Sequence, residues 1–126
     1  MDEFLLRAKE KPTKKWIYGT GITDFVNVYP DRIGRKYLWC NYGWIEVYPE
    51  TISQYIGTDD FDGIKIFGDD IVKPIGKFYE TTQGVVVFKN QSFCVDLNKG
   101  RLFYFHEWDI KWEIIGNIHD NPELLK

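Results

Sequence analysis

Short apolar runs that alternate with polar residues, each closed by turn-forming residues, constrain the fold of this chain more than any other feature. Alternation at every second residue is typical of a half-buried strand, because successive side chains point to opposite faces. In the run Trp44–Val47, we expect Ile45 and Val47 to face the core. The clearest hairpin spans Gly84 to Asp96, with a polar turn between two apolar runs. The pattern therefore predicts a mainly β fold of short-stranded hairpins.

The composition agrees with strands rather than helices. The 126 residues include a single alanine, Ala8, although alanine is the best helix former. Aromatic residues make up 17% of the chain, and such side chains suit a pleated, half-buried surface. A further hairpin is predicted from Phe4 to Gly19 around a polar turn, and an alternating strand from Phe25 to Pro30.

The length predicts one domain over residues 1–126, and a subdivision into residues 1–69 and 70–126 is left open. From Asp70 to Ile115 the expected order is a strand, a longer loop, three strands, a helical turn over His106–Ile110 and a last strand. This order predicts an SH3-like small barrel in the C-terminal half, although any short β-meander gives a similar pattern.

The last residues of the chain contain no catalytic motif and are predicted to be structural. Asn121 is a good helix cap, and Pro122 suits the first helical position, which together predict a short C-terminal helical stub. So short a helix is marginal alone and must dock onto the core or onto a neighbouring subunit. The apolar side chains expected to make these structural or oligomer contacts are Trp112, Ile118, Leu124 and Leu125.

The charge balance argues against a dedicated DNA-binding domain. The net charge is −3, with +1 on residues 1–50 and −4 on residues 51–126. No apolar run is long enough for a signal peptide or a membrane span, so we expect a soluble intracellular protein without a membrane partner. Cys40 and Cys94 lie in apolar, strand-like runs and are expected to be buried free thiols.

One basic cluster surrounds the first predicted turn. Lysines beside an aromatic residue can hold single-stranded nucleic acid through phosphate contacts and base stacking. A solvated hairpin loop beside a core strand is the favoured interpretation, because charge runs in turns are common. The residues that would contact nucleic acid are Lys9, Lys11, Lys14, Lys15 and Trp16.

The segment Thr58–Gly63 imitates a calcium-binding loop. Asp60, Asp62 and Gly63 match its third, fifth and sixth positions. However, Thr58 stands where Asp is expected, Asp69 stands where Glu is expected, and no helices flank the loop. We therefore predict a turn with solvated carboxylates and no metal site.

The histidines do not indicate catalysis. His106 and His119 are the only two, and no hydrolase or metalloprotease motif accompanies them. The sequence therefore predicts no catalytic residue, no metal and no cofactor, and we expect the protein not to be an enzyme.

Three ordered stretches of the chain resemble the YopX family, whose members are small proteins encoded by phages and prophages. The first stretch comprises Arg7, Ala8, Lys15, Trp16 and Tyr18. The second comprises Thr51, Gln54, Tyr55, Gly57, Asp60, Gly63, Ile66, Phe67, Asp70, Ile71 and Val72. The third comprises Trp112, Glu113, Ile115, Gly116, Asn117, Ile118, Asn121, Pro122 and Glu123.

The resemblance implies a largely β fold, a phage or prophage origin and an accessory role in the cytoplasm of the bacterial host. It implies no catalytic residues, since the family has no assigned biochemical activity. We expect a non-enzymatic protein that acts through protein–protein contacts, as a homo-oligomer or with a phage or host protein. The alternative is a small nucleic-acid-binding β-barrel module.

The chain departs from the family pattern at three places. Gly68 and Asp69 stand where Glu-Gly is usual, so a positive φ at Gly68 would shift or strain the turn. Lys9 stands where an aromatic residue is common, and residues 20–48 match poorly, as a variable insertion would.

Overall fold

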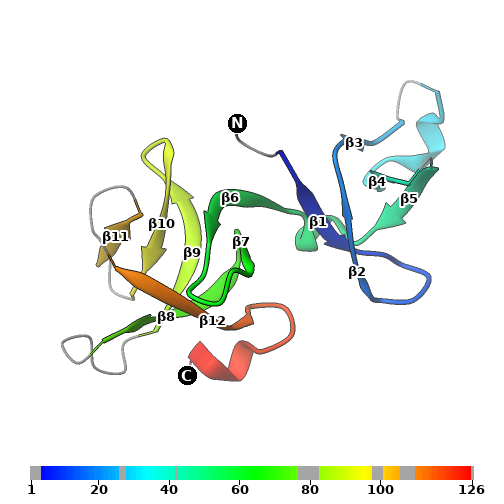
Figure 1. The fold of residues 1–126 in the computed structure, drawn as a ribbon. Coiled ribbons are helices and arrows are strands. Elements are labelled where there is room, and N and C mark those ends of the chain that lie inside the picture. Colours follow the sequence, from blue (N-terminus) through cyan, green and yellow to red (C-terminus); the bar gives the residue numbers. More distant parts are fainter. Residues whose placement is uncertain are drawn as a thin grey trace. The chain divides into compact units, whose positions relative to one another are not determined.

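The computed structural model describes residues 4–25, 28–41, 43–76, 83–97, 101–105 and 110–125 (Figure 1). Within these ranges the chain forms three antiparallel sheets and short 3-10 helices, with no α-helix, which confirms the predicted mainly β fold. The same ranges contain no helix long and apolar enough to cross a membrane. The chain divides into two compact units, Met1–Tyr55 and Ile56–Lys126.

The first unit is built from hairpins. The predicted N-terminal hairpin is present, since β1 (Leu6–Lys9) pairs with β2 (Trp16–Gly19). A second sheet has the order β3-β4-β5, and β6 begins in this unit beside β1. The remaining elements are β3 (Ile22–Thr23), η1 (Pro30–Arg32), β4 (Lys36–Cys40), β5 (Gly43–Val47), η2 (Pro49–Thr51) and β6 (Ser53–Asp59).

Backbone hydrogen bonds link β5 back to the end of β1 and enclose the first core. The Lys11 amide donates to the Glu46 carbonyl at 3.0 Å, and the Tyr48 amide donates to the Lys9 carbonyl at 2.9 Å. At Gly19 the chain passes so close to β4 that a Cβ would lie 2.1 Å from the Trp39 carbonyl oxygen, which requires glycine. The buried residues of this core are Leu6, Ala8, Leu38, Cys40 and Val47.

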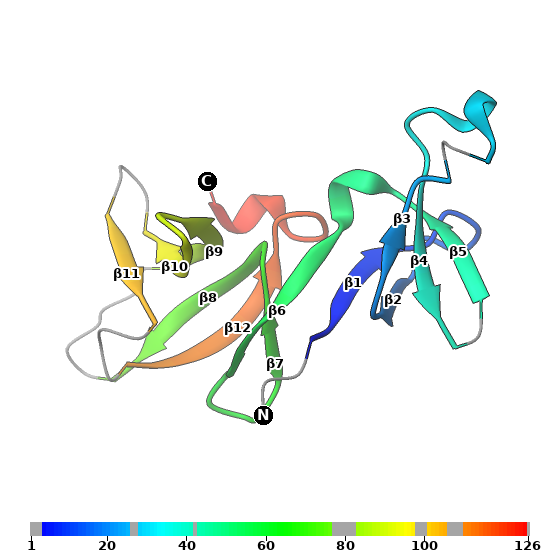
Figure 2. The ribbon, with the colours of Figure 1, turned by 90° about the horizontal axis from the view of Figure 1, so that it is seen from above.

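The second unit contains a five-stranded sheet with the order β11-β10-β9-β8-β12, in which the last strand returns beside the first (Figure 2). In the described residues β11 and β12 are the two edges of the sheet and do not pair, so the sheet is open there. The strands of this sheet are β8 (Asp70–Ile75), β9 (Gly84–Lys89), β10 (Ser92–Asp96), β11 (Leu102–Tyr104) and β12 (Lys111–Asn117). The unit also contains β7 (Lys65–Phe67), which lies beside β6.

The second core explains where the units divide. Ile66 on β7 is fully buried in the same cluster as Val72, Val86, Val95, Leu97 and Trp112. The boundary between the two compact units therefore falls before β7, between Tyr55 and Ile56. Tight packing in this unit also selects glycine, because a Cβ at Gly84 would lie 2.6 Å from the Val95 side chain.

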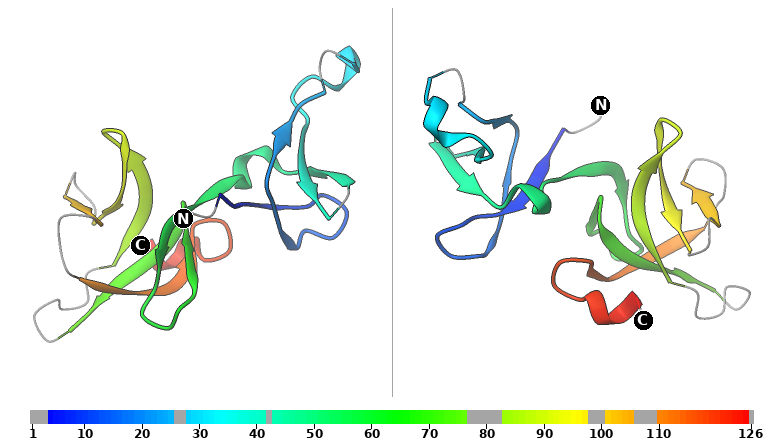
Figure 3. Two further views of the ribbon diagram at one scale, coloured as in Figure 1. Left: turned by 45° about the horizontal axis from the view of Figure 1, so that its top comes forward. Right: turned by 180° about the vertical axis from the view of Figure 1, so that it is seen from behind.

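One local prediction needs correction. The strand predicted from Phe25 to Pro30 is replaced by the earlier β3 and by η1, because Phe25 has φ 56 and Pro30 begins a 3-10 helix. Strand backbone requires a negative φ, so Phe25 ends the extended segment. The C-terminal stub, η3 (Pro122–Leu125), is a single 3-10 turn (Figure 3). Most of the helical turn predicted at His106–Ile110 lies outside the described residues.

Candidate functional site

Five aromatic side chains of the first unit contact one another on and around the β4–β5 hairpin. Trp39 and Trp44 are directly opposite in the strand register, with ring centroids 5.2 Å apart. The Phe25 ring lies 5.5 Å from that of Trp44 and 5.2 Å from that of Tyr37. We call the set formed by Phe25, Tyr29, Tyr37, Trp39 and Trp44 the aromatic cluster.

The cluster is anchored in the unit and open to solvent. Tyr37 is buried, whereas Trp39, Trp44 and Tyr29 are 38%, 41% and 43% exposed. The alternation predicted for β5 is confirmed, because Trp44 is exposed while Val47 is fully buried. A contiguous exposed group of large aromatic side chains is typical of an interaction surface.

The backbone at Phe25 is strained. A φ of 56° is unusual for a bulky residue and costs about 1–3 kcal/mol. Hydrogen bonds hold it, since the amides of Val28 and Tyr29 donate to the Phe25 carbonyl at 3.0 and 2.8 Å. Such strain tends to occur at functional sites, and here it keeps the Phe25 ring against Trp44.

Charges of both signs border the aromatic cluster. The Arg32 guanidinium lies 4.1 Å from the centre of the Tyr29 ring. Close by in sequence, Lys36 forms an ion pair of 3.7 Å with Asp24. The border is therefore mixed in charge rather than basic.

Sequence analysis did not identify the aromatic cluster. It treated residues 20–48 as a variable insertion and assigned them no site. The available signal was the short link at residues 41–43, which places Trp39 opposite Trp44 in a hairpin. The left-handed conformation of Phe25 had no signal, because no turn-forming residue marks it.

The predicted nucleic-acid residues are brought together only in part. Arg7 and Lys9 lie over the Trp16 ring, 4.5 and 5.4 Å from its centre, so the chain's own cations already contact that ring. Lys11 forms a 2.7 Å ion pair with Glu46. Lys14 and Lys15 are the exposed pair, in the turn between β1 and β2.

The calcium-like segment forms a turn held by one buried carboxylate. Asp60 is 8% exposed, and its Oδ1 accepts hydrogen bonds from the amides of Asp62 and Ile64, both at 2.9 Å. Its Oδ2 accepts from the Ile114 amide on β12 at 3.2 Å. The carboxylate thus ties the turn to a distant strand. The predicted turn is confirmed, but Asp60 is buried and not solvated as predicted.

Asp69 has a left-handed backbone conformation in the turn before β8. It has φ 71, so the left-handed residue is Asp69, whereas Gly68 does not have a positive φ. Aspartate tolerates this conformation better than most residues. Asp69 also binds the C-terminal segment, because its carbonyl accepts from the Ile118 amide at 3.0 Å and its carboxylate lies 3.1 Å from Nε2 of His119. His119 therefore has a structural partner, and His106 lies outside the described residues.

The C-terminal residues dock onto the second unit through polar bonds as well as apolar contacts. Asn117 Oδ1 accepts from the amides of His119 and Asp120 at 3.0 and 2.9 Å, and Asn121 Oδ1 accepts from the Asn117 amide at 3.3 Å. A Cβ at Gly116 would lie 2.6 Å from Asn121 Oδ1, so glycine permits this close turn.

The four apolar residues predicted in this segment differ in burial. Trp112 is buried in the second core, and Ile118 and Leu124 are half-buried. The Gln83 side-chain amide donates to the Leu124 carbonyl. Leu125 is 45% exposed, so it contributes much less to docking within the unit than predicted.

The cysteines are buried free thiols, as predicted. Burial raises the pKa of both thiols above the ordinary value of 9.0, and the charge of Glu10 raises the pKa of Cys40 further. The folded state therefore holds these protons more tightly than the unfolded state, so their contribution to stability is lost as the pH rises through the folded pKa. A protonated, buried thiol is a poor nucleophile.

The model of the YopX protein family matches residues 5–126. The chain belongs to the YopX family. The resemblance to this family, which was based on three stretches of the sequence, is therefore confirmed. No curated protein matches this YopX family chain. Among solved structures, it is similar to the crystal structure of protein EF1440 from Enterococcus faecalis, with 20% identity over all of both chains and a TM-score of 0.49.

Several residues that carry the YopX resemblance have structural contacts. Asp60 holds the turn before β7, and buried Asp70 accepts a 2.8 Å hydrogen bond from the Phe67 amide. Asn117 and Asn121 fold the C-terminal turn. These polar positions of the family pattern stabilise the second unit.

Proposed function

We propose that this YopX family protein is a non-enzymatic accessory protein, of phage or prophage origin, that acts through protein–protein contacts in the cytoplasm of a bacterial host. The exposed pair of Trp39 and Trp44 is the observation that carries this proposal. Tryptophan and tyrosine are enriched at protein interfaces, where they account for much of the binding energy. The strained Phe25 supports the proposal, because it fixes the shape of this surface before any partner binds.

A second copy of the chain is the partner that we propose first. A two-fold interface presents the same surface from both subunits, so a surface with both charge signs can be complementary to itself. The aromatic cluster has this property, with Asp24 and Lys36 at 3.7 Å from each other and Arg32 beside Tyr29. A phage or host protein is the other candidate partner for the same surface.

Sedimentation of the wild-type protein and a Trp44→Ser variant tests this proposal. We expect a wild-type oligomer at micromolar concentrations and self-association at least about tenfold weaker in the variant. Ile64→Ser is the matched control, because Ile64 is 57% exposed and belongs to the second unit. A monomeric wild type would contradict self-association, and an unchanged dissociation constant for Trp44→Ser would place the interface elsewhere.

Nucleic-acid binding remains the alternative because of one basic surface. Lys14 and Lys15 are exposed in the turn between β1 and β2, near the cations that lie over Trp16. Gel shifts with a single-stranded oligonucleotide at two salt concentrations distinguish the functions. Binding that weakens steeply with salt, and that a Lys14→Glu, Lys15→Glu double variant abolishes, would favour this alternative.

We also propose that the sheet of the second unit belongs to an SH3-like small barrel. The support is its strand order, with β12 beside β8 at one edge and β11 at the other. In a closed barrel, the amides of β11 would be protected from hydrogen exchange to the same degree as those of β9. If β11 is an open edge, its amides would exchange rapidly.

A further inference from the structure

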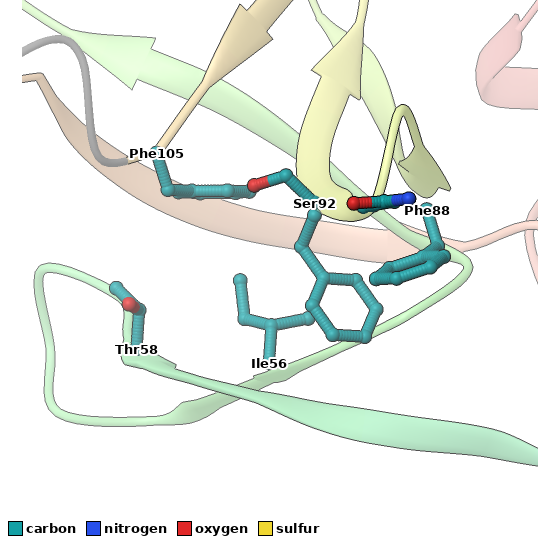
Figure 4. Close-up of a pocket in the computed structure, with 7 residues that line it drawn as sticks. Ile56, Thr58, Phe88, Ser92 and Phe105 are labelled. Carbon is teal, nitrogen blue, oxygen red and sulfur yellow. The ribbon is translucent and has the colours of Figure 1, made fainter.

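A pocket of about 320 Å³ lies beside the β9–β10 hairpin of the second unit (Figure 4). Its apolar lining consists of Ile56, Phe88, Phe93 and Phe105. Three of them, Ile56, Phe93 and Phe105, also pack against the buried core and so form a fixed base. The Phe88 ring meets Phe93 edge to face, with centroids 4.9 Å apart, and is 61% exposed. The pocket thus has a rigid apolar base and one aromatic wall that a ligand could cover.

The other described lining residues are polar and uncharged. They are Thr58, Gln91 and Ser92. A charged ligand group would lose hydration here without gaining an ionic partner among the lining residues. A cation is also disfavoured, because phenylalanine is a weaker cation–π partner than tryptophan and none of the described lining residues is a carboxylate. Hydroxyl and amide groups beside phenyl rings instead suit a neutral ring with one N–H or O–H group.

The turn at this pocket keeps a glutamine where glycine is preferred. Asn90 and Gln91 have φ 53 and 65, as in a two-residue type I′ turn. The second of these positions favours glycine, so Gln91 adds strain that a glycine would remove. The Asn90 side-chain amide donates to the Tyr104 hydroxyl at 2.7 Å, which fixes the turn relative to β11. The strained residue is therefore held in place with its side chain lining the pocket.

We infer that this pocket binds a neutral aromatic ring of the indole or phenol type. Phe88 and Phe93 supply ring faces and edges, and Gln91 supplies an amide that can bond the polar edge of the ligand. The volume is at the lower end of the range for small-ligand sites and accommodates one ring system. Because the site lies wholly in the second unit, it is independent of the aromatic cluster and of the proposed self-association.

Nuclear magnetic resonance titration of the full chain tests the inference with three probes: indole, N-acetyltryptophan amide and choline. We expect saturable shifts of the Ile56 methyl and Ser92 amide signals with indole, with a dissociation constant on the order of 1 mM, and none with choline. If N-acetyltryptophan amide binds as tightly as indole, the ring can come from a partner protein. If only indole binds, the ligand is a small molecule. The absence of saturable indole shifts, or equal shifts with choline, would overturn the inference.

Substitutions of the lining residues show whether indole binds in this pocket. Phe88→Ala removes the exposed wall and should weaken indole binding at least about tenfold. Phe61→Ala is the matched control, since Phe61 is 57% exposed in the same unit but does not line the pocket, and it should bind indole normally. Gln91→Gly should raise the melting temperature while weakening binding severalfold. Indole affinity that is unchanged in both Phe88→Ala and Gln91→Gly would show that the ring binds elsewhere.

Discussion

The two units are both built from short antiparallel strands, but they use their polar and aromatic residues differently. The second unit buries two carboxylates, Asp60 and Asp70, and bonds them to backbone amides. The described part of the first unit buries no carboxylate, and its exposed Trp39 and Trp44 contact each other within a cluster of five aromatic side chains. Buried, hydrogen-bonded carboxylates specify a structure, whereas exposed aromatic rings offer binding energy to a partner.

This difference separates the residues that maintain the fold from those available for binding. The polar positions of the YopX pattern in the second unit have their partners within the chain, as Asp60 and Asn117 show. The aromatic cluster lies in residues 20–48, outside the three stretches that carry the resemblance. These stretches therefore contribute to the scaffold, and the aromatic cluster lies apart from them in the sequence.

The largest expected effect is the loss of stability when Asp60, a buried carboxylate of the second unit, is replaced. Asp60→Ala removes the acceptor for three backbone amides and should lower the free energy of unfolding by about 3 kcal/mol or more. Urea denaturation followed by circular dichroism measures this loss. Asp62→Ala is the control, because Asp62 is exposed, and it should change the stability by less than about 0.5 kcal/mol. Equal effects of the two variants would contradict the structural role of Asp60.

Deletion of residues 120–126 should have the next largest effect. It removes Asn121, which bonds Asn117, and half-buried Leu124, so we expect a loss of about 2 kcal/mol. Leu125→Ser should cost little, since Leu125 is 45% exposed. Thermal denaturation of both proteins, with sedimentation to monitor mass, checks this prediction. A truncated protein with unchanged melting temperature and mass would mean that the C-terminal segment does not stabilise the unit.

The buried thiols allow the two units to be compared within one molecule. Cys40 lies in the first core, Cys94 is fully buried on β10 of the second unit, and burial raises the pKa of both. The first core lacks a buried tryptophan or a buried carboxylate network, so we expect Cys40 to be labelled about tenfold faster than Cys94. Thiol labelling at pH 8, with Cys94→Ala and Cys40→Ala variants to isolate each signal, measures both rates. Identical rates with identical urea dependence would show that the units open together.

The smallest effect concerns the turn before β8. Asp69→Gly relieves the positive φ but removes the contact with His119, so the two changes should nearly cancel, within about 0.5 kcal/mol. Asp69→Ala loses the contact and keeps the strain, and should destabilise by about 1 kcal/mol. Urea denaturation of the two variants separates the contribution of the backbone strain from that of the contact with His119. A strongly destabilised Asp69→Gly would show that the contact outweighs the strain.

Sequence reasoning succeeded where the determining interactions are local. Alternating runs predicted the β1–β2 and β9–β10 hairpins and the alternation along β5, and apolar surroundings predicted the buried thiols of Cys40 and Cys94. A hairpin joins residues that are near in sequence, so its pattern is visible in a short window.

Contacts between distant residues were decided only by the tertiary structure. Asp60 bonds the Ile114 amide across 54 positions, and β5 returns to β1 through the Lys11 and Glu46 backbone. The contact of the Phe25 ring with Trp44 and the pocket between Ile56 and Phe88 likewise depend on segments that meet only after folding. The alternating pattern determines which side chains are buried, because strand geometry is periodic. It does not determine which strands meet, because pairing depends on the fit of whole surfaces and on chain closure.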